Sequence, residues 1–534
     1  MAKAKIFQDK KSLAQVISGI KENADLVAKT YGYTGHDICI KYNGRNFISN
    51  DGVTVSNNIF FDNELKDLGS SFVRNITLNS DLVSNDGTTA SAILTKAIIE
   101  ELEKYLLIPR YRKKIRNWLE VKEGMNKAVE DVIKHLEKEK QSIKIIKKDL
   151  YNVAYTATRD EALSNILCDV FQKIGKDGKV LFKEQEGNDL YVEYKNGFNL
   201  NYGYTTTLLP NVLVDPHIVV YNERINSVEI MKNILNIAIA ECKAKSLVIF
   251  VKDGVADLVM QQLIQIQQSP QINLNINVIS ITGSDETTNK LIEDVSKVTG
   301  ATIINNGTIM TLQASNFGSS KSINITTKQT TIVGGKHNEK EYTKHLEDLE
   351  KKYKNNRNDG DKEQIQKRIA NLKGYVAIIN IGGLSRERIE NYKDKIKDAV
   401  GSIKNAIENG IVVGGGTALL DAYRIMRKHY DVDKSKDYNL GYNVIINSLK
   451  APFKQILINS YDKQIDKNIK KFYTKECVGL GYNAASRKIS GFLIKDGVID
   501  PYNTVVNSLQ NALDICSLFV NLDGFVFVSS EVLE

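Results

Sequence analysis

Hydrophobic and polar residues change their spacing several times along the first quarter of the chain. Apolar residues recur at helical spacing over residues 12–31, and they alternate with polar residues on both sides of Asn43-Gly44. Asn-Gly between two alternating runs predicts a β-hairpin, because both residues tolerate positive φ angles. Residues 64–136 have the spacing of long helices, one of them over Thr89–Leu107. This part of the chain is therefore predicted to be mainly helical.

The spacing changes again between about residues 191 and 376. Short apolar runs alternate there with helical patterns, and the runs lie at 246–251, 277–282 and 301–305. This alternation predicts an α/β domain with a buried sheet. A highly charged segment over 339–371, broken at Asn358-Asp359-Gly360, predicts a helical hairpin. Helical spacing dominates again from Asp394 onward, so the α/β region is an insert between two helical regions.

Length and composition fit several domains in a soluble protein. The chain has 534 residues, more than one hydrophobic core usually supports, so roughly two to four domains are expected. Hydrophobic residues make up 42% and charged residues 25%, which is too apolar for general disorder. The net charge of +8 is dispersed, and the densest basic runs are 110–116, 134–148 and 463–475. Solvated helix faces explain such runs better than a nucleic-acid surface, so no nucleic-acid partner is predicted.

The cysteines and the N-terminus indicate where the protein works. Five cysteines lie far apart without a CxxC pair, and six scattered histidines have no metal-ligand spacing. This pattern suits a reducing cytoplasm, and no metal cluster is predicted. Residues 1–11 lack the apolar stretch of a secretory signal, and no window is apolar enough to span a membrane. We therefore expect a cytoplasmic protein without a membrane partner, in a bacterial cytoplasm or, if phage-encoded, in that of the host.

Asp86-Gly87-Thr88-Thr89 is the first candidate for chemistry, because it comes directly before a helical run. A helix N-terminus offers unpaired N–H groups and a partial positive charge, glycine lets the backbone approach a phosphate, and hydroxyls add donors. Asp86 beside a phosphate needs a bridging cation, which makes it a candidate Mg²⁺ ligand. Four residues alone are explained more simply by a helix cap with a turn, so their context has to decide.

Three further segments carry weaker signals. Asn50-Asp51-Gly52 before Val53-Thr54-Val55 predicts a tight turn into a strand, with Asp51 as a turn former or as a group that positions water or metal. Asp398 lies off the apolar stripe of the helix predicted over 389–407, as a solvated carboxylate would. Gly414-Gly415-Gly416 is either a close backbone approach to a ligand or a loop.

Two predicted helices of the α/β region, over 228–240 and 254–266, carry more apolar residues than one buried face needs. Core packing is the simpler explanation. An excess wider than one stripe can instead mark an exposed apolar surface that binds a partner.

Taken together and in this order, these segments resemble group I chaperonins, the GroEL type, over essentially the whole chain. The matching motifs are Asn50–Val55, Asn85–Thr89, Gly374–Ile379, Asp398, Val413–Gly416, Gly481–Ala485 and Ile499–Pro501. Each motif is weak alone, but their joint order makes coincidence implausible.

The resemblance implies a multidomain fold with α+β and α/β parts. A mostly helical equatorial domain would consist of both chain ends, residues 1–134 and 409–534. A small intermediate domain would comprise 135–194 and 377–408, and an α/β apical domain would be inserted at 195–376. The resemblance also implies homo-oligomeric sevenfold rings, single or double, which enclose unfolded client proteins under a small co-chaperonin lid.

The resemblance further implies an ATP hydrolase that uses Mg²⁺, with K⁺ as an optional further cation. The ATP-binding positions are Thr30, Tyr31, Gly32, Tyr33, Asn50, Asp86, Gly87, Thr88, Thr89, Ala90, Gly415, Asn483, Ala484, Ala485 and Asp500. Asp86 would bind Mg²⁺, and Asp51 and Asp398 would organise the attacking water. The client-binding positions are Tyr204, Leu235, Val259, Leu263 and Ile264.

Three positions beside the expected nucleotide site depart from the family pattern. Tyr33 stands where the family usually has proline, Asn50 where it usually has lysine, and Asn85 where it usually has glycine. The lost cation at position 50 would weaken ATP binding or slow turnover, whereas the three catalytic and metal-binding aspartates are all present. An ATP-hydrolysing chaperone is therefore the first hypothesis. A chaperonin-derived scaffold that hydrolyses ATP weakly or not at all is the alternative.

Overall fold

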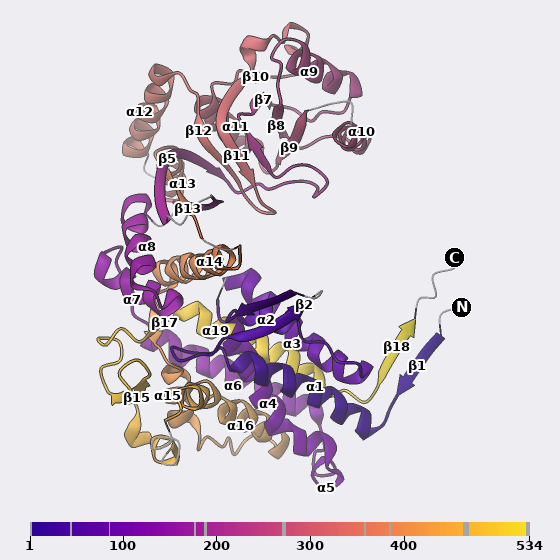
Figure 1. Ribbon diagram of the computed structural model, residues 1–534, viewed down its shortest axis with the longest axis vertical. Coiled ribbons are helices and arrows are strands. Elements are labelled where there is room, and N and C mark those ends of the chain that lie inside the picture. The colour runs from indigo at the N-terminus through magenta and orange to yellow at the C-terminus, as the bar shows by residue number, and fades with distance from the viewer. Residues whose placement is uncertain are drawn as a thin grey trace. The chain divides into compact units, whose positions relative to one another are not determined.

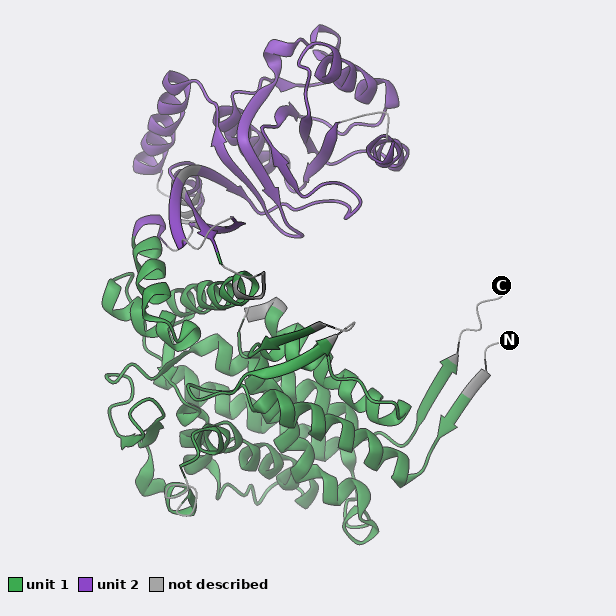
Figure 2. Cartoon of the chain, in the orientation of Figure 1, with its two compact units in different colours: residues 1–172, 383–534 green, residues 173–382 purple. Residues whose placement is uncertain are grey.

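The computed structural model describes residues 3–42, 45–84, 86–175, 178–185, 190–269, 274–356, 359–383, 386–462 and 469–529. The chain forms two compact units, residues 1–172 with 383–534 and residues 173–382 (Figure 2). Both ends of the chain therefore build the first unit, and the second unit is an insertion in the sequence. The finer division into equatorial, intermediate and apical domains stays a prediction. None of the described helices is long and apolar enough to cross a membrane.

Long helices build most of the first unit (Figure 1). They bury their apolar faces against one another. They are α1 (Lys10–Ala28), α3 (Glu64–Ser84), α4 (Thr88–Leu107), α6 (Trp118–Glu139), α16 (Lys436–Ser448) and α19 (Tyr502–Phe519), with the short α5 (Pro109–Arg112). Asp9 caps the start of α1 by accepting a hydrogen bond from the Ser12 N–H at 2.6 Å. Val16 and Ile20 on the inner face of α1 are fully buried. The helical spacing predicted for this part of the chain is confirmed.

The predicted β-hairpin forms, but the turn that follows it leads into a helix. β2 (Ile38–Tyr42) pairs antiparallel with β3 (Arg45–Ser49), while Asn43-Gly44 lies outside the described residues. Gly52–Asn57 forms helix α2, so the strand predicted at this position is wrong. Asp51 caps this helix by accepting the Thr54 N–H at 2.7 Å. An alternation of three residues is too short to distinguish a strand from a helix.

Shorter elements complete the first unit. α7 (Lys147–Thr158) packs against α14 (Arg386–Asn409) and contacts β17 (Ile499–Pro501). α8 (Glu161–Ile174) belongs to this unit except for its last two residues, which begin the second unit. The remaining elements are β1 (Lys3–Phe7) paired with β18 (Phe525–Ser529), β14 (Ile411–Val413) paired with β17, β15 (Gly481–Asn483) paired with β16 (Lys488–Ser490), α15 (Thr417–Met426), α17 (Ala451–Asn459) and η3 (Lys475–Cys477).

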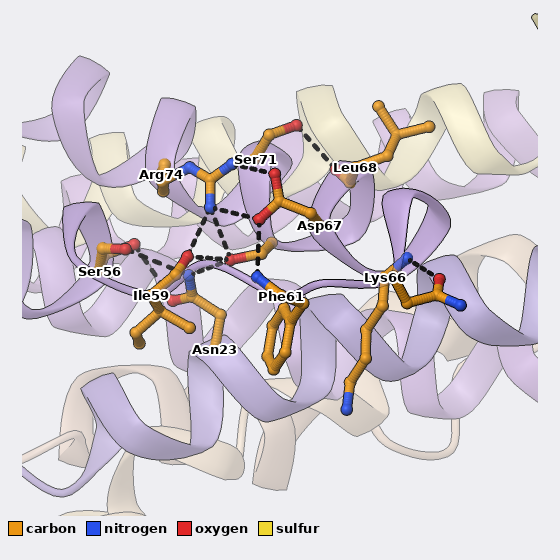
Figure 3. Close-up of polar contacts among 11 residues, drawn as sticks. Asn23, Ser56, Ile59, Phe61, Lys66, Asp67, Leu68, Ser71 and Arg74 are labelled. Atoms are coloured by element: carbon orange, nitrogen blue, oxygen red, sulfur yellow. Dashed lines mark hydrogen bonds and ion pairs between the residues drawn. The ribbon is translucent and has the colours of Figure 1, made fainter. Parts of the chain in front are cut away.

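A buried polar network fixes α2 between α1 and α3 (Figure 3). The Asn23 amide donates to the Ser70 hydroxyl at 2.8 Å and accepts from the Ser56 hydroxyl at 3.1 Å. All three residues are fully buried. Because these buried polar groups are paired with one another, they hold the helices in one arrangement at no cost in unmet hydrogen bonds.

Arg74 extends this network to the segment after α2 (Figure 3). Its guanidinium donates to both carboxylate oxygens of Asp67, each at 3.1 Å, and to the Ile59 carbonyl at 2.5 Å. The same carboxylate accepts the Phe61 N–H at 3.1 Å. A two-pronged arginine–carboxylate pair is directional as well as strong, so the chain that leaves α2 is held firmly.

A mixed ten-stranded sheet forms the centre of the second unit, with the main order β4-β13-β5-β12-β11-β7-β8-β9. Its strands are β4 (Lys179–Glu184), β5 (Leu190–Leu200), β6 (Val212–Val214), β7 (His217–Tyr221), β8 (Ser246–Lys252), β9 (Asn275–Ile281), β10 (Ile303–Ile304), β11 (Gly318–Ile325), β12 (Thr330–Gly335) and β13 (Tyr375–Ile381). The three apolar runs of the sequence form β8, β9 and β10, and all but the last residue of β8 are buried. The predicted α/β region with a buried sheet is confirmed.

Helices α9 (Val228–Ala240), α10 (Asp257–Gln268) and α11 (Asp285–Thr299) follow strands β7, β8 and β9, which pair in parallel. The charged segment forms the predicted helical hairpin of α12 (Glu339–Asn355) and α13 (Asp359–Leu372), while Asn358 lies outside the described residues. Buried Asp294 on α11 binds both helices of this hairpin, through His345 at 2.8 Å and Arg368 at 2.6 Å. Short 3₁₀ turns η1 (Ile309–Thr311) and η2 (Ala314–Asn316) complete the unit.

Candidate functional site

A cavity of about 450 Å³ lies in the first unit, and all of its lining residues belong to that unit. The lining comes from the loop after α1, the starts of α2 and α4, the end of α7, α14, and the segments around β14, β15 and β17. Every residue that the resemblance assigns to ATP binding or to the attacking water lines this cavity. The sequence therefore predicted which segments come together, while the role of each residue stays a prediction.

The start of α4 forms a polar turn at this cavity. Gly87 precedes the helix with a left-handed φ of 81°, and a Cβ atom there would lie 2.6 Å from the Ser508 hydroxyl oxygen. A Cβ atom on Gly52 would lie 2.5 Å from the Thr89 hydroxyl oxygen, so the starts of α2 and α4 approach closely. Unpaired N–H groups, the helix dipole and the hydroxyls of Thr88 and Thr89 meet here, as phosphate binding requires. Asn85 lies outside the described residues.

Hydrogen bonds from two other helices fix Asp86 immediately before α4. Its carboxylate accepts from the Gly87 N–H at 2.6 Å, from the Ser402 hydroxyl on α14 at 2.6 Å and from the Thr504 hydroxyl on α19 at 3.5 Å. Burial raises the pKa of Asp86, and these hydrogen bonds oppose the rise because they stabilise the ionised form. Sequence reasoning missed Ser402 and Thr504, because nothing local signals a contact with a residue 316 or 418 positions away.

α14 brings two further carboxylates to the cavity. Burial raises the pKa of Asp398 well above its usual range, and the negative charges of Asp51 and Asp86 raise it further. Asp398 is half-buried among acids, so the alternative of a solvated surface carboxylate is wrong. One turn earlier, burial and the charge of Asp51 raise the pKa of Asp394 to about 6. Asp394 was not predicted, although its spacing of four residues from Asp398 placed it on the same helix face.

The glycines after β14 bring the backbone to the cavity wall. Gly415 and Gly416 have left-handed φ angles of 65° and 70° and form the turn into α15. The pairing of β14 with β17 places Asp500 opposite Val412. The Gly415 N–H donates to the Asp500 carboxylate, while burial and then the charge of Asp86 raise the pKa of Asp500 to about 7. Asp500 is therefore poised to change its charge near neutral pH.

A side-chain turn after β15 adds three predicted positions to the wall. The side-chain oxygen of Asn483 accepts the N–H groups of Ala485 and Ser486, each at 3.1 Å. This turn fixes Asn483, Ala484 and Ala485 at the cavity.

The loop from Thr30 to Tyr33 lies beside the turn that begins α4. The Thr30 hydroxyl is 3.4 Å from the Thr89 hydroxyl. The buried Tyr31 has a raised pKa because of its burial and the charges of Asp500 and Asp86. The Tyr33 side chain is 46% exposed, and the centroid of its ring is 6.5 Å from that of Tyr155 on α7. The contribution of α7 to the cavity was not predicted, because the resemblance carried no motif from this helix.

The donor set suits Mg²⁺ that arrives with a nucleotide. Within the described ranges, no group of three His, Cys, Asp or Glu side chains is arranged to hold a metal by itself. Mg²⁺ is usually bound through one or two carboxylates, water and substrate phosphates. A buried carboxylate at Asp86, beside a helix start that is suited to phosphate, would provide that combination.

Three of the five predicted client-binding side chains are core residues of the second unit. Leu235, Val259 and Leu263 are 6%, 1% and 0% exposed, because α9 and α10 pack with these faces on the sheet. They therefore do not form an exposed apolar rim in this chain, whereas Tyr204 and Ile264 are partly exposed. The role of all five residues in binding clients stays a prediction.

Two comparisons with known proteins agree with the fold. A sequence profile of the TCP-1/cpn60 chaperonin family matches residues 24–529. Among solved structures, the chain is similar to the chaperonin gp146 from the bacteriophage EL 2 (Pseudomonas aeruginosa), crystallised in the presence of ATP-BeFx. The match has a TM-score of 0.73 at 18% identity and covers 98% of this chain and 99% of gp146. The fold is thus a chaperonin fold of mixed helix and sheet, and the chain belongs to the TCP-1/cpn60 chaperonin family.

Proposed function

We propose that the chain is an ATP-dependent chaperone that hydrolyses ATP with Mg²⁺ and encloses non-native proteins for folding. The observation that carries this proposal is the convergence of the glycine turn before α4 with Asp51, Asp86 and Asp398 around one cavity. Phosphoryl transfer to water depends on positioning and charge stabilisation rather than on a covalent nucleophile. Carboxylates on separate helices beside a phosphate-binding turn supply both.

Each group has a definite task in this proposal. The N–H groups at the start of α4 and the hydroxyls of Thr88 and Thr89 bind phosphate oxygens. Asp86 holds Mg²⁺, which neutralises phosphate charge and orients the terminal phosphoryl group. Asp51 and Asp398 orient the attacking water, and Asp398 accepts its proton. The raised pKa of Asp398 suits this role, because it makes the carboxylate a stronger base than an ordinary aspartate.

The position of α14 determines whether the site is complete. This helix carries Asp398 and also Ser402, whose hydroxyl binds the carboxylate of Asp86. A shift of α14 would therefore withdraw the base and release the metal ligand together. Coupling of hydrolysis to a change of shape follows from that arrangement.

We further propose homo-oligomeric rings of seven subunits in the cytoplasm, with a small co-chaperonin lid. Two features of the first unit support self-association. The isolated two-stranded sheet of β1 and β18 exposes Ile6, Val526 and Val528, each more than 60% accessible. The β2–β3 hairpin exposes Ile48, which is 62% accessible. Short two-stranded sheets with apolar faces and open edges are marginal alone and gain stability by pairing with another chain.

Steady-state ATP hydrolysis tests the proposal. The purified wild-type assembly should hydrolyse ATP slowly and only with Mg²⁺. Asp398→Ala should abolish turnover while ATP binding, followed by calorimetry, persists. An assembled wild-type ring that binds ATP without turning it over would exclude the hydrolysing chaperone.

That outcome would favour a second candidate, a chaperonin-derived scaffold that binds nucleotide without hydrolysing it. The observation behind this alternative is Asn50, a neutral side chain that lines the cavity where the family pattern has a cation. The burial of Leu235, Val259 and Leu263 also removes part of the expected client surface.

A further inference from the structure

The cavity of the first unit is rich in acids and poor in basic groups. Its acids include Asp51, Asp86, Asp394, Asp398 and Asp500, whereas Arg159 and Lys395 are its only basic side chains in the described part of the chain. A nucleoside triphosphate adds several negative charges to such a site. Cationic side chains that reach the phosphates are therefore important for binding, beyond any metal ion.

The backbone at Arg159 is unusual for an arginine. Arg159 ends α7 with a left-handed φ of 53°, and the next residue, Asp160, already caps α8 by accepting the Leu163 N–H at 3.0 Å. Glycine is the usual residue for a left-handed helix end, because a side chain strains this conformation. The tight corner between the helices therefore does not explain an arginine. Strain of this kind often marks a residue whose side chain has a function.

Arg159 lines the cavity, and its guanidinium lies beside the loop at Thr30 that approaches the start of α4. It donates to the Thr30 carbonyl at 3.4 Å, and the hydroxyl of Thr30 is 3.4 Å from that of Thr89 at the start of α4. This is its one hydrogen bond to a described residue, and it forms no ion pair with any carboxylate among those residues. A guanidinium has five N–H donors, so most of them remain available to a ligand.

Arg159 stays positively charged although its side chain is half-buried. Burial lowers its pKa, and the nearby Asp37 and Tyr33 oppose this change. Arginine nevertheless stays protonated at neutral pH in proteins, unlike lysine in a similar place.

We infer that Arg159 is a phosphate-binding residue of this site, which donates to the terminal phosphate oxygens of the bound nucleotide and supplies the cation that position 50 lacks. The inference deepens the proposed function and rests on it, because it presupposes ATP in this cavity. A forked guanidinium suits this role, since it can bind two phosphate oxygens at once. The hydrogen bond to Thr30 then holds the side chain ready before the nucleotide arrives.

A purely structural role is the competing explanation. In that case Arg159 only ties the end of α7 to the loop at Thr30, and its loss would loosen the whole cavity. Binding of adenosine, which carries no phosphate, should then suffer as much as binding of ATP.

Calorimetric titration of the full-length assembly with ATP and with adenosine separates the two explanations. Arg159→Gln should weaken ATP binding by about 10- to 100-fold, as expected for the loss of a charged hydrogen bond, and leave adenosine binding unchanged. Arg159→Lys should fall between the wild type and Arg159→Gln. Arg110→Gln, which removes an exposed arginine outside the cavity, serves as the matched control and should bind both ligands normally.

A charge-rescue variant provides an independent test. Asn50 lines the same cavity, so Asn50→Lys in the Arg159→Gln background should restore much of the ATP affinity. If Arg159→Gln misfolds, Arg159→Gly replaces it, because glycine relieves the strained φ and retains the helix end.

The outcomes separate this inference from the proposed function. Wild-type protein that does not bind ATP at all overturns the proposed function and the inference with it. Wild-type binding that is retained in Arg159→Gln overturns the inference alone. Equal losses of ATP and adenosine binding assign Arg159 a structural role. The absence of rescue by Asn50→Lys overturns the claim that Arg159 supplies the cation that position 50 lacks.

Discussion

The two ends of α2 lie in contrasting electrostatic surroundings. Beyond its C-terminal end, the carboxylate of Asp67 pairs with Arg74 through both oxygens, and the neighbouring Asn23, Ser56 and Ser70 satisfy one another (Figure 3). At its N-terminal end, Asp51 shares a cavity with Asp398, where burial and neighbouring acids raise the pKa of Asp398. At the C-terminal end, which we call the paired end, the acid is matched by a base and stabilises the fold. At the N-terminal end, the crowded end, several acids lie close together where a bound cation can neutralise their charges.

Breaking the Asp67–Arg74 pair at the paired end should cost the most stability. Arg74→Leu leaves Asp67 and the Ile59 carbonyl without their partner, so the free energy of unfolding of the first unit should fall by about 2–3 kcal/mol. The single tryptophan, Trp118 on α6, reports this transition during urea unfolding. Arg110→Leu, at an exposed position, is the control and should change little. An unaltered transition in Arg74→Leu would show that the network contributes no net stability.

The crowded end should make the nucleotide-free protein less stable as pH rises. Asp394 and Asp500, with pKa values raised to about 6 and about 7, bind more protons when folded than when unfolded. Stability contributed by the protonated forms is therefore lost between about pH 4 and pH 7. The melting temperature should drop by on the order of a few degrees across this range, and Asp500→Asn should flatten the dependence. A melting temperature that climbs through this range in both proteins would contradict the assignment.

Removing one crowded acid should stabilise the protein while it destroys activity. Asp398→Asn relieves repulsion with Asp51 and Asp86, so the free energy of unfolding should increase by about 1 kcal/mol at pH 8. The gain should shrink as pH falls, because the wild-type carboxyl has a raised pKa and loses its charge more readily than an ordinary aspartate. Asp67→Asn is the matched substitution at the paired end, and there the same chemical change should destabilise. Destabilisation by both substitutions would show that the acids at the crowded end do not destabilise the fold, in contradiction to the proposed difference between the two ends of α2.

The smallest effect is expected from the loss of the hydrogen bond that Ser402 donates to Asp86, the proposed metal ligand. Ser402→Ala removes a donor to Asp86, which should raise the pKa of that carboxyl further and weaken Mg²⁺-dependent ATP binding by about 3- to 10-fold. Titration with ATP at varied Mg²⁺ concentration measures this change. Ser517→Ala, on α19 outside the cavity, should have no effect on it. Equal ATP affinities in the wild type, Ser402→Ala and Ser517→Ala would mean that the hydrogen bond from Ser402 does not help Asp86 to bind the metal.

The sequence predicted much of the architecture, because its patterns are local. Helical spacing identified α1 and α4, and apolar runs identified the buried strands of the second unit. The strand predicted at Val53 failed, since a three-residue alternation gave no indication that Asp51 would cap a helix. Ordered motifs located the cavity, but they did not indicate Arg159 or Tyr155, because both residues contribute through long-range packing of α7. Apolar excess on α10 likewise did not distinguish buried Val259 from exposed Leu258.

The division of the first unit between the two chain ends also determines when it can form during synthesis. Helices α1, α3, α4 and α6 leave the ribosome before the whole second unit, whereas α14, α16 and α19 come last. Until then, the faces of α4 and α6 that pack on α16 and α19 have no partner, so apolar surface that is buried in the finished unit stays exposed. Each nascent subunit must therefore carry unprotected apolar surface for about two hundred residues of elongation, which is the hazard that chaperones relieve in other proteins.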